Sequence, residues 1–379
     1  MKTKFTHNLE RKIKKDIWSK EHNYFIIVQP GLEEIAISEI ESFGYTIDKQ
    51  VVGGLELKGK LDVLYNISLK SRVATKILFR LSSFKASHLS DIKKHIKKLD
   101  LNLFWKEKTH FDIVVSSKSS KLYHTDMVKE FILKEIESYS KENDLNYNMD
   151  KKSREKLFVR IENNEVTVSL DANGDFLYKR NIKKQINKAP IRENIAAALL
   201  LKYWNTENTL LDPMCGSATF SIEASMIKNN IMPGVKRKFN FMNWVSFREK
   251  TFNFIKNKYN TNISFDVENI ELSDLNKASV DIANRNISIF NGLNAKKENF
   301  FDIVPSKESG FIVMNLPYDK RIKVEKNFYQ KIEKKLMKDF KNWNYLLLVA
   351  KNNKFNNLEL TDLKIKNGGI LLNVYHGKI

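Results

Sequence analysis

Apolar residues recur along the chain in two patterns, one with the alternation of strands and the other with the spacing of helices. In the first half, apolar runs predict strands at 24–28, 51–57, 77–80, 111–115, 158–161 and 166–170. Apolar residues three and four positions apart predict helices at 32–43, 61–69, 91–98 and 126–138. This alternation predicts an α+β segment, ferredoxin-like in type, over residues 23–80 and a second α+β segment over residues 81–175.

The pattern changes over residues 176–379, where buried strands alternate with longer helices. Strands are predicted at 210–212, 269–274, 311–315 and 345–350, and helices at 189–203, 220–227, 246–259 and 277–290, with another helix ending near 338. Two further strands are predicted within 363–375, on either side of Asn367, Gly368 and Gly369. The fold class is therefore α/β, and the C-terminal part is Rossmann-like.

Residues 1–22 form a basic N-terminal arm. Two interpretations fit it, a helix that touches RNA or a frayed tail, and the sequence favours the tail.

The chain has 379 residues, of which 42% are hydrophobic, so it can bury sizeable cores. Its formal net charge of +20 makes a polyanion the first partner to consider, because neutralised phosphates release counterions. The alternative is that many of these lysines only solvate the surface.

Cysteine and histidine usage excludes several site classes. The single cysteine, Cys215, rules out an internal disulfide framework and a cysteine-based zinc cluster, and the seven histidines lack metal-ligand spacing. No secretory signal and no apolar run of about 20 residues is present, so we expect a cytoplasmic protein without a membrane or metal partner.

A strand, a tight turn and a helix follow one another at residues 210–227. The strand ends in Asp212, and the turn contains small residues that let a ligand approach the backbone closely. The turn lacks the phosphate-loop ending Gly-Lys-Ser/Thr and the full dinucleotide glycine pattern. An adenosyl ligand without a pyrophosphate therefore fits it better.

A second strand ends in the sequence Asn315-Leu316-Pro317-Tyr318. With the first turn, it resembles class I S-adenosylmethionine-dependent methyltransferases that modify exocyclic amino groups. The sequence from Asp212 to Thr219 closely resembles the 23S rRNA guanine-N2 methyltransferases that carry a THUMP domain. Further likeness lies in residues 29–34, in residues 71–74 and in the hairpin that ends at Leu170 and Asp171.

The resemblance implies a domain order and a cofactor. It makes 81–175 a THUMP RNA-binding domain and 176–379 a class I methyltransferase domain with an antiparallel last strand. It implies that S-adenosylmethionine is bound by Asp212, Pro213, Met214, Cys215, Gly216, Ser217 and Thr219, with Asn194 bordering the site.

Two further cofactor contacts keep alternatives open. Asp274, at the end of the second strand, is expected to accept hydrogen bonds from the ribose, although it could instead cap the helix that begins near Lys277. Asn299 falls where the family contacts the adenine amino group, and Glu298 is the alternative. Cys215 is not expected to act as a nucleophile, because it lies in the cofactor turn.

The family's chemistry assigns roles to residues 315–318. The Asn315 side-chain oxygen and the Leu316 carbonyl would accept the two N–H groups of an exocyclic amine, so that its lone pair points at the methyl donor. Pro317 fixes the turn, and Tyr318 offers a ring on which the target base can stack.

The sequence departs from the family pattern at three places. Leu316 replaces a proline, Ala218 replaces a glycine, and residues 180–183 read Arg-Asn-Ile-Lys where the family has Arg-Gly-Tyr-Arg. These departures leave reduced activity open.

The leading hypothesis is an RNA guanine-N2 methyltransferase acting on 23S rRNA. The alternatives are a tRNA guanine-N2 methyltransferase and a catalytically degenerate RNA-binding protein that keeps the fold. The sequence does not give the target nucleotide, the oligomeric state, or whether the RNA is modified within an assembling particle.

Overall fold

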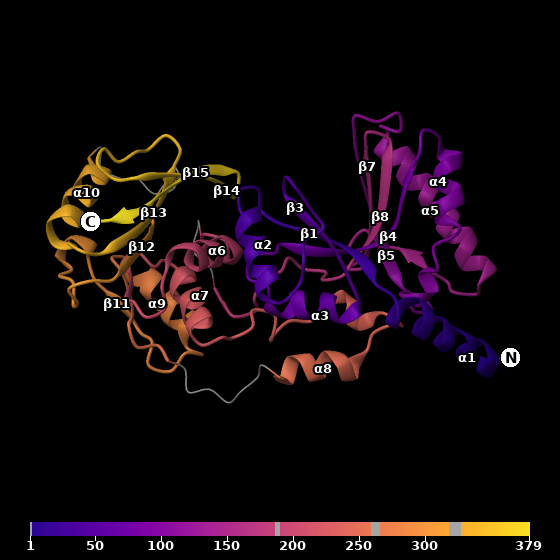
Figure 1. The fold of residues 1–379 in the computed structure, drawn as a ribbon, viewed down its shortest axis with the longest axis horizontal. Coiled ribbons are helices and arrows are strands. Elements are labelled where there is room, and N and C mark those ends of the chain that lie inside the picture. The colour runs from indigo at the N-terminus through magenta and orange to yellow at the C-terminus, as the bar shows by residue number, and fades with distance from the viewer. Residues whose placement is uncertain (1, 186–189, 259–265, 318–326) are drawn as a thin grey trace.

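The computed structural model describes residues 2–185, 190–258, 266–317 and 327–379. These residues form two sheets, one towards each end of an elongated molecule (Figure 1). Within these ranges, no helix has the length and apolar character that crossing a membrane requires.

The first sheet belongs to the N-terminal half. Its eight strands lie in the order β2 (Lys49–Val51), β3 (Gly54–Gly59), β1 (His22–Ile27), β4 (Lys76–Lys85), β8 (Glu165–Asp171), β7 (Lys156–Glu162), β5 (His110–Lys118) and β6 (Asn148–Met149). The pairs are antiparallel, except that β5 runs parallel to β7 and β6. The helices are α2 (Glu33–Ser42), α3 (Leu61–Lys70), α4 (Leu89–Ile96) and α5 (Thr125–Glu142), with the 3₁₀ turn η2 (Leu101–Leu103).

Strand β4 is common to the two predicted N-terminal segments. Phe79 of β4 pairs with Tyr24 on one side and with Leu170 on the other. The expected boundary at residue 80 therefore falls inside a strand, and one continuous sheet runs through both segments.

Two local predictions had different outcomes. The single strand expected at 51–57 is wrong, because Gly53 adopts a positive φ of 80° and turns the chain between β2 and β3. The hairpin expected between the strands β7 and β8 is confirmed, with Asn163 and Asn164 both at positive φ.

The N-terminal arm is helical, so the expected frayed tail is wrong. It forms α1 (Lys2–Ile13) and the π-helical turn η1 (Lys14–Trp18). Ile13 and Ile17, one turn apart, are both buried, and the Trp18 indole N–H donates to the Ser246 carbonyl over 2.8 Å. These tertiary contacts stabilise the helical conformation of a basic segment whose intrinsic helix propensity alone would not keep it folded.

The second sheet has the strand order β11 (Ala295–Lys297), β10 (Ile270–Asp274), β9 (Leu210–Asp212), β12 (Phe311–Asn315), β13 (Asn344–Ala350), β15 (Ile370–Lys378) and β14 (Leu360–Asn367). The first five are parallel, whereas β15 runs antiparallel to both of its neighbours. The helices are α6 (Glu193–Tyr203), α7 (Thr219–Lys228), α9 (Lys277–Ile287) and α10 (Phe328–Asp339), with the 3₁₀ turn η4 (Phe300–Asp302). The predicted α/β sheet with an antiparallel last strand is confirmed.

Successive residues of the parallel strands face opposite sides of this sheet. Leu210 belongs to the cluster that contains α6 and α7 side chains, whereas Leu211 clusters with Ile332 and Leu336 of α10. Helices therefore cover both faces, and the carboxyl ends of the strands are left to form a site.

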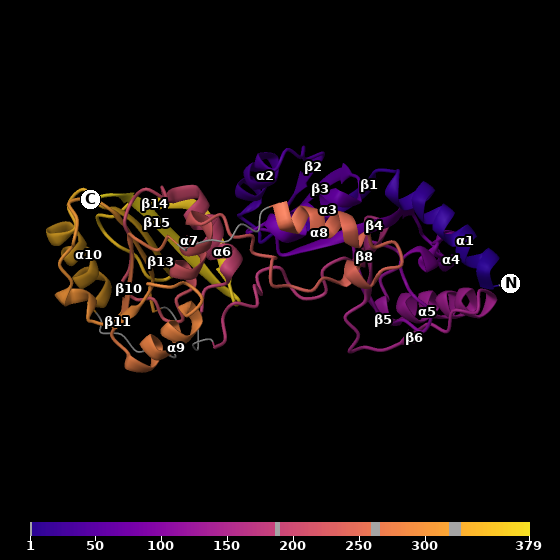
Figure 2. The same cartoon turned by 90° about the horizontal axis from the view of Figure 1, so that it is seen from below.

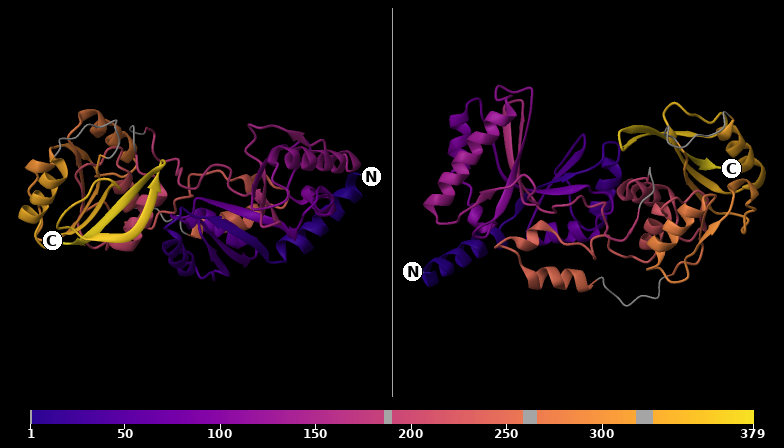
Figure 3. Two further views of the ribbon diagram at one scale, coloured as in Figure 1. Left: turned by 90° about the horizontal axis from the view of Figure 1, so that it is seen from above. Right: turned by 180° about the vertical axis from the view of Figure 1, so that it is seen from behind.

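Residues 230–258, which we call the bridging segment, leave the second sheet and pack on the N-terminal half. The backbone N–H groups of Gly234, Phe241 and Val245 donate to carbonyls of Leu69, Ala172 and Phe104 over 2.9–3.0 Å. The segment contains η3 (Asn240–Asn243) and α8 (Glu249–Lys258), and α8 packs on α3 (Figures 2 and 3). The helix expected from 246 thus begins at 249, and residue 259 lies outside the described residues.

Candidate active site

The cofactor turn, residues 213–218, connects β9 to α7 at the carboxyl edge of the second sheet. Gly216 and Ala218 both adopt positive φ, at 55° and 63°. The Cys215 N–H donates to the Ser273 carbonyl over 3.0 Å, so the turn crosses the end of β10. The first N–H groups of α7 therefore lie at this edge, where a helix leaves its donors without intrahelical partners.

Asp274 joins the turn to the end of β10. Its Oδ2 accepts from the Gly216 N–H over 3.0 Å, and its Oδ1 accepts from the Asn276 N–H over 2.8 Å. The cap of α9 is Asn276, whose side chain accepts from the Ala278 N–H, so the alternative role of Asp274 as the helix cap is wrong.

Asp212 is buried beneath the turn. The Ser221 hydroxyl donates to its Oδ2 over 2.7 Å. Burial, reinforced by the nearby carboxylate of Asp274, raises the pKa of Asp212 to about 7. Burial also raises the pKa of the Cys215 thiol well above its usual range, which favours its protonated, weakly nucleophilic form.

Ser217, Thr219 and Asn194 have different surroundings. The Ser217 hydroxyl is buried and has no hydrogen-bond partner among the described residues, and the Thr219 hydroxyl accepts from Lys183 over 3.1 Å. The Asn194 amide instead donates to Val73 and Thr75 of the N-terminal half, over 3.5 and 3.3 Å. Its predicted contact with the cofactor stays a prediction.

Asn299 lies at the same edge as Asp274. The backbone N–H of the preceding residue, Glu298, donates to the Asp274 carbonyl over 3.1 Å. The Asn299 side-chain oxygen accepts from the Phe301 N–H over 3.2 Å and caps η4. Asn299 is thus held in place, and its expected role towards adenine stays a prediction.

The predicted catalytic turn, residues 315–318, begins at Asn315, at the end of β12, the strand beside β9. The Leu316 N–H donates to the Leu348 carbonyl over 3.0 Å, and the Leu316 side chain is fully buried. A proline could not make this bond, so packing and a backbone hydrogen bond restrain the turn where the family uses a ring. Tyr318 lies outside the described residues.

Tyr329, which the sequence analysis did not predict as a site residue, forms a hydrogen bond with Pro317, the residue after Leu316. Its hydroxyl donates to the Pro317 carbonyl over 2.7 Å and accepts from the Asn353 amide over 2.8 Å. These two hydrogen bonds fix Pro317 to α10 and to the loop that follows β13.

The Asn315 Oδ1 is a buried acceptor without a partner among the described residues. Leaving such an oxygen unsatisfied costs about 1–3 kcal/mol, so an N–H group from a ligand would be stabilised there.

The connector between the two halves, residues 176–188, carries a buried ion pair. Arg180 pairs with Glu223 of α7 over 3.2 Å, and both side chains are almost fully buried. Asn181 adopts a φ of 59°, which explains why a glycine suits this position in the family and why asparagine is tolerated. In the sequence, the acidic Glu223 within the otherwise apolar helix α7 was the feature that could have predicted a buried ion pair.

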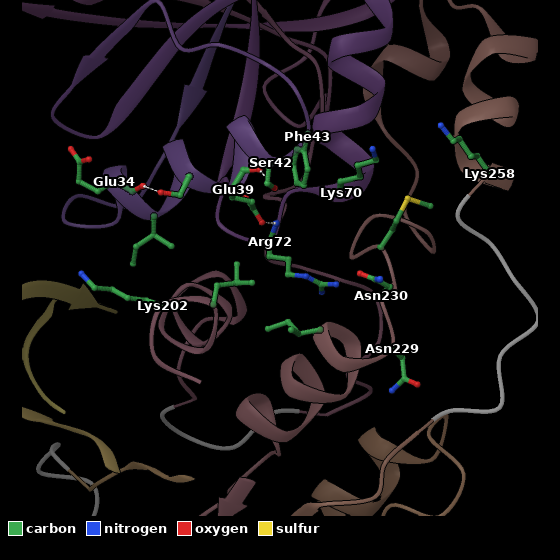
Figure 4. Close-up of a pocket in the computed structure, with 15 residues that line it drawn as sticks. Glu34, Glu39, Ser42, Phe43, Lys70, Arg72, Lys202, Asn229, Asn230 and Lys258 are labelled. Carbon is green, nitrogen blue, oxygen red and sulfur yellow. Dashed lines mark hydrogen bonds between the residues drawn. The ribbon is translucent and has the colours of Figure 1, made fainter. Parts of the chain in front are cut away.

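A cavity of about 930 Å³ lies between α2 and the carboxyl ends of α6 and α7 (Figure 4). Its lining includes Glu39, Arg72 and Asn229. Because the cofactor turn is at the amino end of α7, this cavity is separate from the candidate active site.

Comparisons with known proteins agree with this architecture. Residues 180–368 match the family model described as RMKL-like, methyltransferase domain, and residues 23–78 match the RlmL ferredoxin-like domain. A candidate RNA methyltransferase of Synechocystis sp., slr0064, is 28% identical over 337 residues, which cover 84% of this chain and 86% of the relative.

The ribosomal RNA large subunit methyltransferase K/L of Buchnera aphidicola subsp. Schizaphis graminum is 27% identical over 370 residues. That match covers 89% of this chain and 52% of the relative, so the chain spans about half the length of this K/L protein. The crystal structure of SMU.472, a candidate methyltransferase complexed with SAH, has a TM-score of 0.84 at 23% identity and covers 95% of this chain and 98% of that one.

The chain has the class I methyltransferase fold, and the SMU.472 structure with this fold holds SAH. The cofactor turn fits such a ligand, because Gly216 has no side chain to obstruct it and the buried Ser217 hydroxyl lacks a protein partner among the described residues.

Proposed function

We propose that this chain is an RNA methyltransferase that methylates the exocyclic N2 of a guanosine, with 23S rRNA as its substrate. The observation that carries the proposal is the buried Asn315 Oδ1, which lacks a partner among the described residues and lies at the end of the strand beside the cofactor turn.

The chemistry follows from what an exocyclic amine needs. Its lone pair is delocalised into the ring, so the amine must be oriented before it can act as a nucleophile. Asn315 Oδ1 and the Leu316 carbonyl would each accept one of its N–H groups, which directs the lone pair out of the base plane. S-adenosylmethionine, when bound, supplies an electrophilic methyl group. Asp212, Gly216, Ser217 and Asp274 would hold it.

Charge and relatives support RNA as the substrate class. The net charge of +20 favours a polyanion. The Synechocystis and Buchnera relatives are named for RNA and for ribosomal RNA of the large subunit. We assign RNA binding to the N-terminal half, with 81–175 as a THUMP domain, on the basis of sequence resemblance.

The test uses radiolabelled S-adenosylmethionine with unmodified 23S rRNA and, separately, unmodified bulk tRNA, followed by nucleoside analysis. We expect N2-methylguanosine in the 23S rRNA, and no label with the Asn315→Ala protein. N2-methylguanosine in tRNA alone would show that the substrate is tRNA and not 23S rRNA. A methylated adenine in either RNA would show that guanine is not the target base.

Two negative results would have separate meanings. No label together with intact cofactor binding by calorimetry would indicate a ribonucleoprotein substrate, to be tried as assembling large-subunit particles. No label and no cofactor binding would favour the non-catalytic RNA-binding protein.

A further inference from the structure

Asn286 of α9 makes four hydrogen bonds from a side chain that is only 1% exposed. Its Oδ1 accepts from the backbone N–H groups of Lys184 and Gln185, over 2.8 and 3.1 Å. Its Nδ2 donates to the carbonyls of Gln185 and Ser217, over 2.8 and 3.1 Å. Both lone pairs and both hydrogens of the amide are therefore used.

These four bonds join two separate parts of the chain. Ser217 belongs to the cofactor turn, whereas Lys184 and Gln185 belong to the connector. The same connector is anchored to α7 by the Arg180–Glu223 pair and by the Lys183–Thr219 bond. Asn286 thus bonds both to the connector and to the cofactor turn, and the connector in turn bonds to α7, the helix that follows this turn.

The turn needs such support, because its backbone is held in an unfavourable conformation. Gly216 and Ala218, on either side of Ser217, both have positive φ, and Ala218 carries a side chain that disfavours it. Without an outside contact, the turn would relax towards conformations that no longer fit a ligand.

We infer that Asn286 is a positioning residue for the cofactor turn, and that it couples cofactor binding to the docked state of the connector. The inference rests on the proposed assignment of this turn to S-adenosylmethionine. By linkage, a ligand that stabilises the turn also stabilises the connector that shares its contact.

Asn284 provides a matched control on the same helix. Its amide also makes two backbone hydrogen bonds, donating to the Ala295 carbonyl over 3.2 Å and accepting from the Ala295 N–H over 2.8 Å. These bonds tie α9 to β11 and do not reach the turn.

The experiment compares Asn286→Ala with Asn284→Ala in the full chain by calorimetric titration of S-adenosylmethionine. We expect the dissociation constant to rise about tenfold for Asn286→Ala and to change less than about twofold for Asn284→Ala, whatever their thermal stability. An unchanged constant for Asn286→Ala, or equal weakening by both variants, would overturn the inference.

Amide hydrogen exchange of the unaltered protein gives a second measurement, should Asn286→Ala fail to fold. S-adenosylmethionine should slow exchange at Lys184 and Gln185, and unchanged exchange at saturating cofactor would overturn the coupling. If the unaltered chain binds no cofactor, the proposed function fails and this inference fails with it. Normal S-adenosylmethionine binding with unchanged amide exchange at Lys184 and Gln185 would overturn only the coupling and leave the proposed function standing.

Discussion

The Gly216 N–H donates to Asp274 Oδ2 across 3.0 Å, which joins the cofactor turn to the neighbouring strand. Each Asp274 oxygen has one such backbone donor, and a carboxylate can accept about four hydrogen bonds in all. Asp274 can therefore support the turn and still accept from the hydroxyl groups of a ribose.

Asp274→Ala is expected to weaken S-adenosylmethionine binding by about 10- to 100-fold, because it removes both the ligand's acceptor and the support of the turn. Calorimetry measures the constant, and circular dichroism checks that the fold is intact. An affinity equal to that of the unaltered protein would leave Asp274 with a purely structural role.

Asn315→Ala is expected to lower kcat by at least about 10²-fold, because the amine loses a buried acceptor that orients it. Cofactor affinity should stay nearly the same, since Asn315 belongs to the other turn. Labelled methyl transfer and calorimetry measure the two quantities. Full activity of this variant would mean that the assigned site is wrong.

Tyr329→Phe tests whether the Pro317 carbonyl must be held. The ring keeps its packing, but the hydroxyl that donates to Pro317 is lost, so we expect kcat to fall about tenfold with little change in cofactor affinity. Steady-state kinetics on the RNA substrate measure the effect. An unchanged kcat would show that packing alone fixes the catalytic turn.

Ala218→Gly is expected to stabilise the protein by about 1 kcal/mol, because glycine adopts the φ of 63° without the penalty of a side chain. For a chain of 379 residues the corresponding rise in Tm is about 1–2 °C. Asn230→Gly, at a φ of 52°, is the control and should change Tm much less, because asparagine tolerates this region. Equal shifts in the two variants would contradict the explanation.

Asp212 gives stability a pH dependence. Burial raises its pKa from 3.8 to about 7 in the folded state, so folding binds a proton between these values. Its contribution to stability is fully present below about pH 4 and is lost as the pH rises through about 7.

Relative to Asp212→Asn, the unaltered protein should therefore lose about 2 kcal/mol of unfolding free energy between about pH 5.5 and about pH 8.5. Urea unfolding at both pH values measures this difference. Parallel pH profiles for the two proteins would contradict the raised pKa.

The parts of the site that the sequence predicted are those set by local patterns. An apolar run followed by turn residues predicts the strand that ends at Asp212 and the strand that ends at Asn315, each with the turn after it. Because the two strands are parallel neighbours, their carboxyl ends lie at one edge of the sheet. The N-cap of α9 is harder to predict from the sequence, because Asp and Asn residues both cap helices. Whether Asp274 or Asn276 is the cap depends on the exact first residue of α9.

The parts that the sequence did not predict depend on remote partners. Phe241 and Phe252 look like residues of a local loop and helix, yet their rings pack with Tyr65 at centroid distances of 4.9 and 5.6 Å. Across the domain junction, the Arg72 guanidinium likewise donates to the carbonyls of Met226 and Ile231. No periodicity in the chain records such pairings, because they are made only when the two halves fold against each other.

The bridging segment also constrains the order in which the protein can mature on the ribosome. The first sheet is fully synthesised by Asp171, but Tyr65 receives the rings of Phe241 and Phe252 only about seventy residues later. A nascent N-terminal half would expose this apolar surface until the cofactor turn had already been translated. The N-terminal half can therefore complete its packing only in a chain whose residues 213–218, the predicted cofactor turn, are already made.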